Sequence, residues 1–309
     1  MSRRNPSWRW VVWGAAAGLI TWYYRDERRK ALARLSVGSR LVKTALGDVE
    51  IGESGEGQPL LVLHGGGAGY DGGLAAVWPE LGYRVIAPSR PGYLRTPLES
   101  GRSFEQQADL FAALLDSLEI KKTAVWAMSG GGPAALQFAL RHPKRCRGLV
   151  LLSAINTATP PYPLPMRIAA KFGEMCDFLP WLMMNTPLNL LLAGPDFLSQ
   201  CAGQPAKMDL YRRTMNSMFP MSLRAKGVRN DLFWIKRLVQ MPLENIKAPT
   251  LVIHGDHDSV VPFIQGLNSA EGIPHAQLRI IPGGDHLCLI THMEPVREEI
   301  KKFLDQLPK

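Results

Sequence analysis

A serine that directly follows a run of strand-forming residues is the first candidate for chemistry in this chain of 309 residues. Thr123–Met128 has the apolar composition of a buried strand, and it leads straight into Ser129. Three glycines and a helix-forming segment at 134–141 follow. A strand that becomes a helix at one serine makes a sharp turn, which leaves the hydroxyl exposed beside unpaired helix N–H groups. We therefore predict that Ser129 is a nucleophile.

The residues around Ser129 depart at one position from the usual G-x-S-x-G pattern of such a turn. Ala127 stands where the first glycine is expected, and Gly131 matches the second. Alanine is small enough to let neighbouring backbones pass closely, so the pattern remains compatible with a nucleophile. The alternative is an ordinary serine at a strand–turn–helix junction.

A serine nucleophile needs a histidine base and an acid that orients it. Two later strand-like runs each end in a polar segment, at 254–258 and at 283–286. Because the carboxyl ends of parallel strands share one edge of a sheet, we expect Asp258 and His286 to lie near Ser129. Asp256, two residues from Asp258, remains the alternative acid.

The elements that would position these side chains alternate between strands and helices. Buried strand-like runs are expected near 40–44, 49–52, 60–64, 83–88, 123–128, 147–153, 247–254 and 277–281, and a capping box at 103–106 opens a helix. This alternation predicts an α/β fold with a doubly wound, mostly parallel sheet of about eight strands. A closing helix is expected to bury Ile290, Met293, Val296, Ile300, Phe303 and Leu307.

The alternation stops between residues 157 and 245. A stiff proline-rich linker at 160–165 is followed by helix-forming sequence, and nine of the twelve methionines lie between Met166 and Met241. We therefore predict a core in two parts, 36–156 and 246–309, with a helical cap at 157–245. Such a methionine-rich cap would make an adaptable apolar pocket.

From about residue 40 to the C-terminus, the chain resembles the α/β-hydrolase fold family. The resemblance rests on the order Ser129, Asp258, His286 and on the motifs H-G-G at 64–66, G-D-x-D-x-x-V-P at 255–262 and G-x-H at 284–286. It implies a serine hydrolase with an inserted helical cap, in which His286 takes the serine proton and Asp258 orients the imidazole. It also implies an oxyanion hole formed by the N–H groups of Gly66 and Gly130, with Gly67 as the alternative to Gly66.

The implied function is cleavage of an ester, thioester or amide of an apolar small molecule through an acyl-enzyme, without metal or cofactor. A serine-triad C–C bond hydrolase and an acyltransferase remain alternatives, because cap geometry decides the scissile bond and the acceptor. A catalytically silent binding protein of the same fold is the non-enzyme alternative. Filled positions for all three triad residues disfavour it.

Two other kinds of site are disfavoured. Residues 67–72 form a G-x-G-x-x-G pattern after a strand, and Arg90 ends the next strand, as a site for a 2′-phosphate could require. However, two strands precede the pattern, and Pro79 interrupts the helix that should follow it. The His and Asp residues at 254–258 lack the spacing of known metal sites. The four cysteines form no C-x-x-C pair, which disfavours a zinc site and a disulfide framework.

The net charge of +9 is concentrated at the N-terminus. Residues 1–34 carry eight Lys or Arg and two acidic residues, so only +3 remains for the other 275 residues. This even balance, without a basic stripe of interleaved aromatics, disfavours nucleic-acid binding.

The uncharged run at 10–24 is bordered by aromatic residues and arginines on both sides. Its 15 residues are fewer than a bilayer needs, but interfacial aromatics and snorkelling arginines could extend a span. We predict a hydrophobic helix that anchors residues 1–35 in a membrane, with the catalytic domain on the cytoplasmic side and self-association through Gly14 and Gly18 as an option. The alternative is a helix packed on the hydrolase body.

Overall fold

The computed structural model describes residues 7–158, 171, 173, 175–186 and 195–308. Its strands are β1 (Arg40–Thr44), β2 (Gly47–Ser54), β3 (Gln58–Leu63), β4 (Tyr83–Pro88), β5 (Thr123–Met128), β6 (Cys146–Leu152), β7 (Thr250–Gly255) and β8 (Ala276–Ile281). Its helices are α1 (Ser7–Val37), α2 (Tyr70–Ala76), α3 (Phe104–Ser117), α4 (Gly132–Arg141), α6 (Phe178–Met184), α8 (Pro195–Cys201), α9 (Pro205–Asn216), α10 (Ala225–Ile235), α11 (Ile264–Gly272), α12 (Cys288–Thr291) and α13 (Met293–Asp305).

The eight strands form one sheet in the order β1-β2-β4-β3-β5-β6-β7-β8. The β1–β2 and β2–β4 pairs are antiparallel, and the other pairs are parallel. This confirms the predicted doubly wound, mostly parallel sheet. After β3 the chain forms β4 on one side of β3, and it then crosses to form β5 on the other side. The direction in which successive strands are added to the sheet therefore reverses between β3 and β5. The carboxyl edge at such a reversal is where open α/β sheets place their sites.

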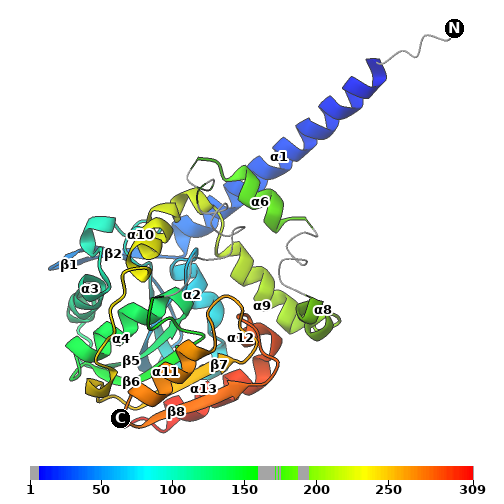
Figure 1. The fold of residues 1–309 in the computed structure, drawn as a ribbon. Coiled ribbons are helices and arrows are strands. Elements are labelled where there is room, and N and C mark those ends of the chain that lie inside the picture. Colours follow the sequence, from blue (N-terminus) through cyan, green and yellow to red (C-terminus); the bar gives the residue numbers. More distant parts are fainter. Residues whose placement is uncertain (1–6, 159–170, 172, 174, 187–194, 309) are drawn as a thin grey trace.

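Helices cover both faces of the sheet (Figure 1). On one face, α3 and α4 pack their apolar residues against the strands. On the other face, α2 and α13 do the same, and Trp78 packs edge to face against the fully buried Trp126 of β5. The strands between these layers are apolar on both sides, which explains why their sequences are continuous hydrophobic runs rather than alternating ones.

The predicted closing helix is broken into two. α12 ends at Thr291 and α13 begins at Met293, because His292 leaves the helical conformation at φ −116° and ψ 45°. The apolar periodicity nevertheless identified the correct face, since all six predicted positions are buried. Earlier in the chain, Ser103 and Gln106 form the predicted capping box of α3.

Helices α6, α8, α9 and α10 lie between β6 and β7 in the sequence, within the segment that we predict to be a cap. Figure 1 places α6, α8 and α9 together on the side of the molecule where α1 meets the body. The proline-rich linker expected at 160–165 lies outside the described residues. The division of the chain into core and cap stays a prediction.

The helix α1 has two different halves. Its first half projects away from the body (Figure 1), and its large apolar side chains are exposed: Trp8, Trp10, Val11, Val12, Trp13, Leu19, Ile20 and Trp22. Its second half packs on α6 and the segment after α9. There Tyr24 makes edge contacts with Phe178, Trp181 and Phe219, and Arg28 pairs with the buried Asp177 at 3.1 Å.

In the part of the chain that the structure describes, no helix is both long and apolar enough to cross a membrane. The prediction of a membrane anchor at residues 1–35, and of membrane localisation with it, is therefore wrong. The physical reason is that the apolar run is short and the helix continues into charged residues. Several of these charged residues form ion pairs. Asp26 pairs with Lys30 of the same helix at 2.8 Å, and Arg28 pairs with Asp177 of the body. Self-association through Gly14 and Gly18 stays a prediction.

Candidate active site

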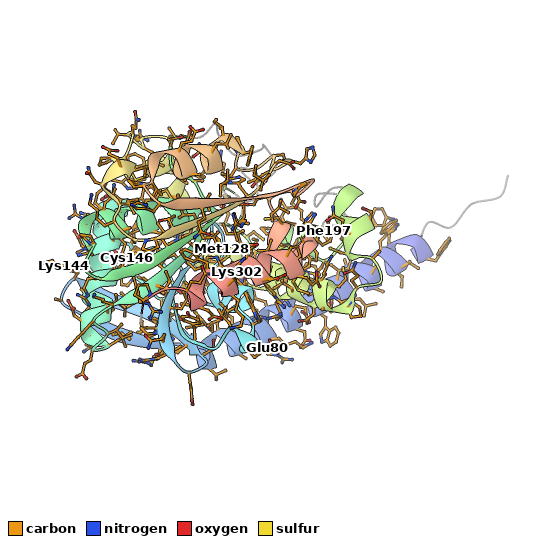
Figure 2. The ribbon with its side chains drawn as sticks, turned by 90° about the horizontal axis from the view of Figure 1, so that it is seen from below. Glu80, Met128, Lys144, Cys146, Phe197 and Lys302 are labelled. Atoms are coloured by element: carbon orange, nitrogen blue, oxygen red, sulfur yellow. The ribbon has the colours of Figure 1, made fainter. Side chains whose placement is uncertain are left out.

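The turn after β5 presents Ser129 at the carboxyl edge of the sheet. Figure 2 shows the preceding residue, Met128, on the side of the sheet toward Phe197 of α8, with Lys144 and Cys146 at the opposite end. Ser129 has a φ of +49°, which is a strained conformation for a residue with a side chain. The close packing of the surrounding backbone imposes this turn.

The small residues beside Ser129 allow that close packing. A Cβ on Gly131 would lie 2.6 Å from the carbonyl oxygen of Leu63, so only glycine fits there without movement. Ala127 is fully buried and is accommodated where the usual pattern has glycine. The departure from G-x-S-x-G noted in the sequence therefore leaves the turn intact.

The structure brings Ser129, His286 and Asp258 together in a continuous chain of hydrogen bonds. The Ser129 Oγ lies 3.1 Å from Nε2 of His286, and Nδ1 of the same ring lies 2.8 Å from Oδ2 of Asp258. These residues follow β5, β8 and β7, whose parallel carboxyl ends share one edge. The imidazole of His286 is partly exposed, whereas Asp258 is buried. The hydrogen-bonded series is therefore accessible to a substrate from the Ser129 hydroxyl and not from the carboxylate.

The surroundings of Asp258 keep its carboxyl group ionised. Burial would by itself raise the pKa of Asp258, but hydrogen bonding from His254 and His286 outweighs that effect and holds the pKa well below its usual range. The backbone N–H groups of Val260 and Val261 also donate to Oδ1, at 2.9 and 2.8 Å. A charged carboxylate is therefore available to orient His286 and to stabilise it as an imidazolium.

The alternative acid, Asp256, points elsewhere. Its Oδ1 accepts the N–H of Gly283 at 2.7 Å, and the residue is exposed. The structure therefore places Asp258, and not Asp256, against His286. Asp256 instead links the turn after β7 to the turn after β8.

The glycine-rich loop after β3 lies directly beside Ser129. A Cβ on Gly65 would be 3.1 Å from Cβ of Ser129, and Gly67 has a φ of +81°. Gly66 lies between them in the sequence, and Gly130 follows Ser129 in the helical turn 129–131. This arrangement agrees with an oxyanion hole at Gly66 and Gly130. Their roles stay predictions, as does the alternative donor Gly67.

His64 supports this loop from behind. The ring is fully buried, its Nδ1 donates to the carbonyl of Gly65 at 2.7 Å, and its Nε2 accepts the N–H of Arg90 at 3.0 Å. Burial, together with the nearby Arg90 charge, lowers the pKa of His64 well below its usual value. His64 is therefore neutral, and both ring nitrogens are used to hold the loop.

Arg90 belongs to a buried network that spacing in the sequence could not reveal. Its guanidinium is fully buried and pairs with Asp231 of α10, which also accepts the hydroxyl of Tyr93 at 2.6 Å. Its Nε donates to the carbonyl of His64 at 3.0 Å. The 2′-phosphate role considered for Arg90 is therefore disfavoured, since this side chain joins the core to α10. Asp231 lies 141 residues away, so no local pattern connects the two.

Two methionines from the segment after α9 border the same loop. Atoms of Met221 and Met218 lie 3.8 and 4.0 Å from the position of a Cβ on Gly67. Both residues are partly exposed, as is Ser129. Apolar side chains from the predicted cap therefore lie against the loop beside Ser129, in the region where the sequence concentrates its methionines.

In the described ranges, no group of three or more His, Cys, Asp or Glu side chains is arranged to hold a metal ion. The four cysteines are free thiols.

Comparisons with known proteins identify the family. The sequence pattern of the alpha/beta hydrolase fold matches residues 58–293. A 2-hydroxymuconate semialdehyde hydrolase of Pseudomonas putida is 30% identical over 262 residues, covering 82% of this chain and 89% of the relative. A poly(3-hydroxyalkanoate) depolymerase of Ectopseudomonas oleovorans is 32% identical over 260 residues, covering 80% and 84%. An alpha/beta hydrolase fold protein from Nakamurella multipartita superposes with a TM-score of 0.76 at 31% identity, covering 86% of this chain and 98% of that one.

This chain therefore belongs to the α/β-hydrolase family, as its motifs suggested, and it is a hydrolytic enzyme of that family.

Proposed function

We propose that this protein is a serine hydrolase that cleaves an ester of an apolar small molecule through an acyl-enzyme. The observation that carries the proposal is the hydrogen-bonded chain from Ser129 through His286 to Asp258. A chain of this geometry can activate a hydroxyl as a nucleophile at neutral pH. A thioester or an amide would react at the same site.

In the proposed reaction, the Ser129 hydroxyl attacks the substrate carbonyl and passes its proton to Nε2 of His286. The tetrahedral oxyanion is bound by the N–H groups of Gly66 and Gly130. The alcohol leaves with the proton from His286, and water then attacks the acyl-enzyme by the reverse proton path. Asp258 remains ionised throughout and balances the charge of the imidazolium.

The surroundings of the serine favour an apolar substrate. Met218 and Met221 border the glycine-rich loop, and flexible thioether side chains adapt to acyl groups of different shapes. We propose that residues 157–245 act as a cap whose described helices cover this approach. The relative named as a poly(3-hydroxyalkanoate) depolymerase supports an ester substrate.

A second candidate is hydrolysis of a C–C bond at the same site. The relative named as a 2-hydroxymuconate semialdehyde hydrolase supports it, at a similar level of identity. The two candidates use the same serine, histidine and aspartate. They differ in the bond that is cleaved, so a comparison of substrates separates them.

The test is a panel of p-nitrophenyl esters from acetate to dodecanoate, run beside 2-hydroxymuconate semialdehyde. We expect kcat/KM to rise from acetate toward medium chains, because longer acyl groups bury more apolar surface at about 0.8 kcal/mol per methylene. A strict preference for acetate would contradict an apolar pocket. Turnover of the semialdehyde without ester hydrolysis would favour the second candidate.

A further inference from the structure

Asp258 has a second histidine neighbour, which the proposed mechanism does not use. His254 lies in β7, four residues before Asp258, and its side chain is fully buried. Its Nε2 lies 2.9 Å from the carbonyl oxygen of Val261 and 3.3 Å from Oδ2 of Asp258. The same Oδ2 accepts the hydrogen bond from His286. Two imidazole rings therefore converge on one carboxylate oxygen.

The contacts of His254 determine which nitrogen carries the proton. Nε2 faces two acceptors, a carbonyl and a carboxylate, so it must be the N–H donor. Nδ1 is buried and has no hydrogen-bond partner among the described residues. It also packs against α11, where a Cβ on Gly266 would lie only 2.7 Å from it. A proton on Nδ1 would have no acceptor, whereas the N–H of Nε2 points toward Val261 and Asp258.

The other donors around Asp258 show what His254 adds. The N–H groups of Val260 and Val261 occupy Oδ1, and His286 donates to Oδ2. An ionised carboxylate accepts about four hydrogen bonds, so the shared N–H of His254 fills the remaining place. Val261 is held twice, because its N–H donates to Asp258 and its carbonyl accepts from His254. His254 thus fixes both the carboxylate and the turn that carries it.

We propose that His254 is a positioning residue for Asp258, holding Oδ2 toward His286 and keeping the carboxylate ionised while His286 receives the serine proton. The inference rests on the proposed function of Ser129, His286 and Asp258. Asp285, beside His286, and Cys288 of α12 are two further titratable groups of the described residues that interact electrostatically with Asp258. Burial raises the pKa of Cys288 to about 12, so this thiol stays neutral, and neither group donates to Oδ2.

The first test compares two substitutions that keep or remove the donor. His254→Gln can place an amide N–H near the position of Nε2, whereas His254→Phe fills the ring volume without a donor. We expect His254→Phe to lower kcat about 10- to 100-fold with little change in KM, as for loss of a hydrogen bond to a charged group, and His254→Gln to recover most of that loss. Phe263→Leu is the matched control, since Phe263 packs against the His254 ring with centroids 5.9 Å apart. If His254→Phe does not fold, His254→Asn replaces it, because its amide is too short to reach the Nε2 position.

The pH profile separates positioning from a structural role. Without the His254 N–H, the Asp258–His286 pair loses a donor and binds its proton more tightly. The acid limb of kcat/KM should therefore move to higher pH in His254→Phe. A variant that merely folded less well would have a lower plateau with an unshifted limb, and this result would overturn the proposal.

A double-mutant cycle with Asp258→Asn completes the test. If His254 acts through Asp258, its substitution should have at most a small further effect in the Asp258→Asn background. An equal fall in kcat in both backgrounds would contradict the proposal.

The Ser129→Ala variant separates a failure of the proposed function from a failure of the role proposed for His254. Turnover that survives Ser129→Ala would remove the proposed function itself, whereas an inactive Ser129→Ala with a fully active His254→Phe would remove only the role of His254.

Discussion

At the scale of single residues, two aspartates two positions apart have different surroundings. Asp258 is buried and bonded to His286 at 2.8 Å, and its pKa lies well below the usual range because hydrogen bonds outweigh the effect of burial. Asp256 is exposed and bonded to the backbone of Gly283. The difference comes from the turn after β7, which directs the Asp258 carboxylate toward His286 and the Asp256 carboxylate toward the backbone of Gly283.

This difference predicts unequal effects of the same substitution. Asp258→Asn should lower kcat by about 10⁴-fold, because an amide no longer stabilises the imidazolium and favours the wrong histidine tautomer. Asp256→Asn should leave kcat within about tenfold, since the amide oxygen can still accept the Gly283 N–H and weakening of one exposed hydrogen bond amounts to about 1 kcal/mol. Steady-state kinetics on both variants, with circular dichroism to confirm folding, checks the assignment. A larger effect at Asp256 would reverse the two roles.

At the scale of elements, the second half of α1 packs on helices far from it in the sequence. Ala31 is 3% exposed and lies in a small core with Trp181 and Phe219, and Tyr24 packs against the same group. Arg28 adds an ion pair to Asp177, which also accepts hydrogen bonds from Ser222. The helix therefore braces the segment that carries Met218 and Met221 toward the serine.

We expect Ala31→Leu to lower the free energy of unfolding by about 1–3 kcal/mol, because the added atoms overpack this small core. Ala33→Leu is the matched control, since residue 33 is exposed on the same helix and should stay within about 0.5 kcal/mol of the parent protein. Chemical denaturation measures both values. Hydrogen exchange should also accelerate at residues 177–184 in Ala31→Leu alone. Equal stability of the two variants would mean that α1 does not brace this region.

At the scale of the whole molecule, the buried neutral His64 links stability to pH. Folding holds its pKa well below the usual value of 6.5, through burial and the neighbouring Arg90 charge. Below about pH 6.5 the unfolded chain binds a proton at this site that the folded chain does not. The stability is therefore fully present above that pH, and it falls as the solution becomes more acidic.

The expected contribution is up to about 1.4 kcal/mol of unfolding free energy per pH unit below about pH 6.5. His64→Asn should remove this part of the slope while keeping a donor for Gly65. Denaturation between pH 4.5 and 8, chosen to span that value, measures the difference. An unchanged slope in His64→Asn would show that folding does not lower the pKa of His64.

Local sequence patterns predicted the strands of the sheet and the polar residues that follow them. Buried strand-like runs indicated the sheet, and polar residues at three strand ends indicated which side chains would meet. Contacts between distant segments were beyond such patterns, as in the pairing of Arg90 with Asp231, which lies 141 residues away. The membrane anchor was predicted from composition at 10–24, and this prediction was wrong because the apolar run is short and the same helix continues into charged residues.

The central claim is that Ser129 is the covalent nucleophile. The direct measurement is to treat the full chain with a fluorophosphonate and locate the adduct by peptide mass spectrometry, with Ser129→Ala in parallel. We expect one adduct on Ser129, loss of turnover in step with labelling, and neither labelling nor turnover in Ser129→Ala. An adduct on another residue, such as Ser153 at the end of β6, or undiminished hydrolysis by Ser129→Ala would contradict the account.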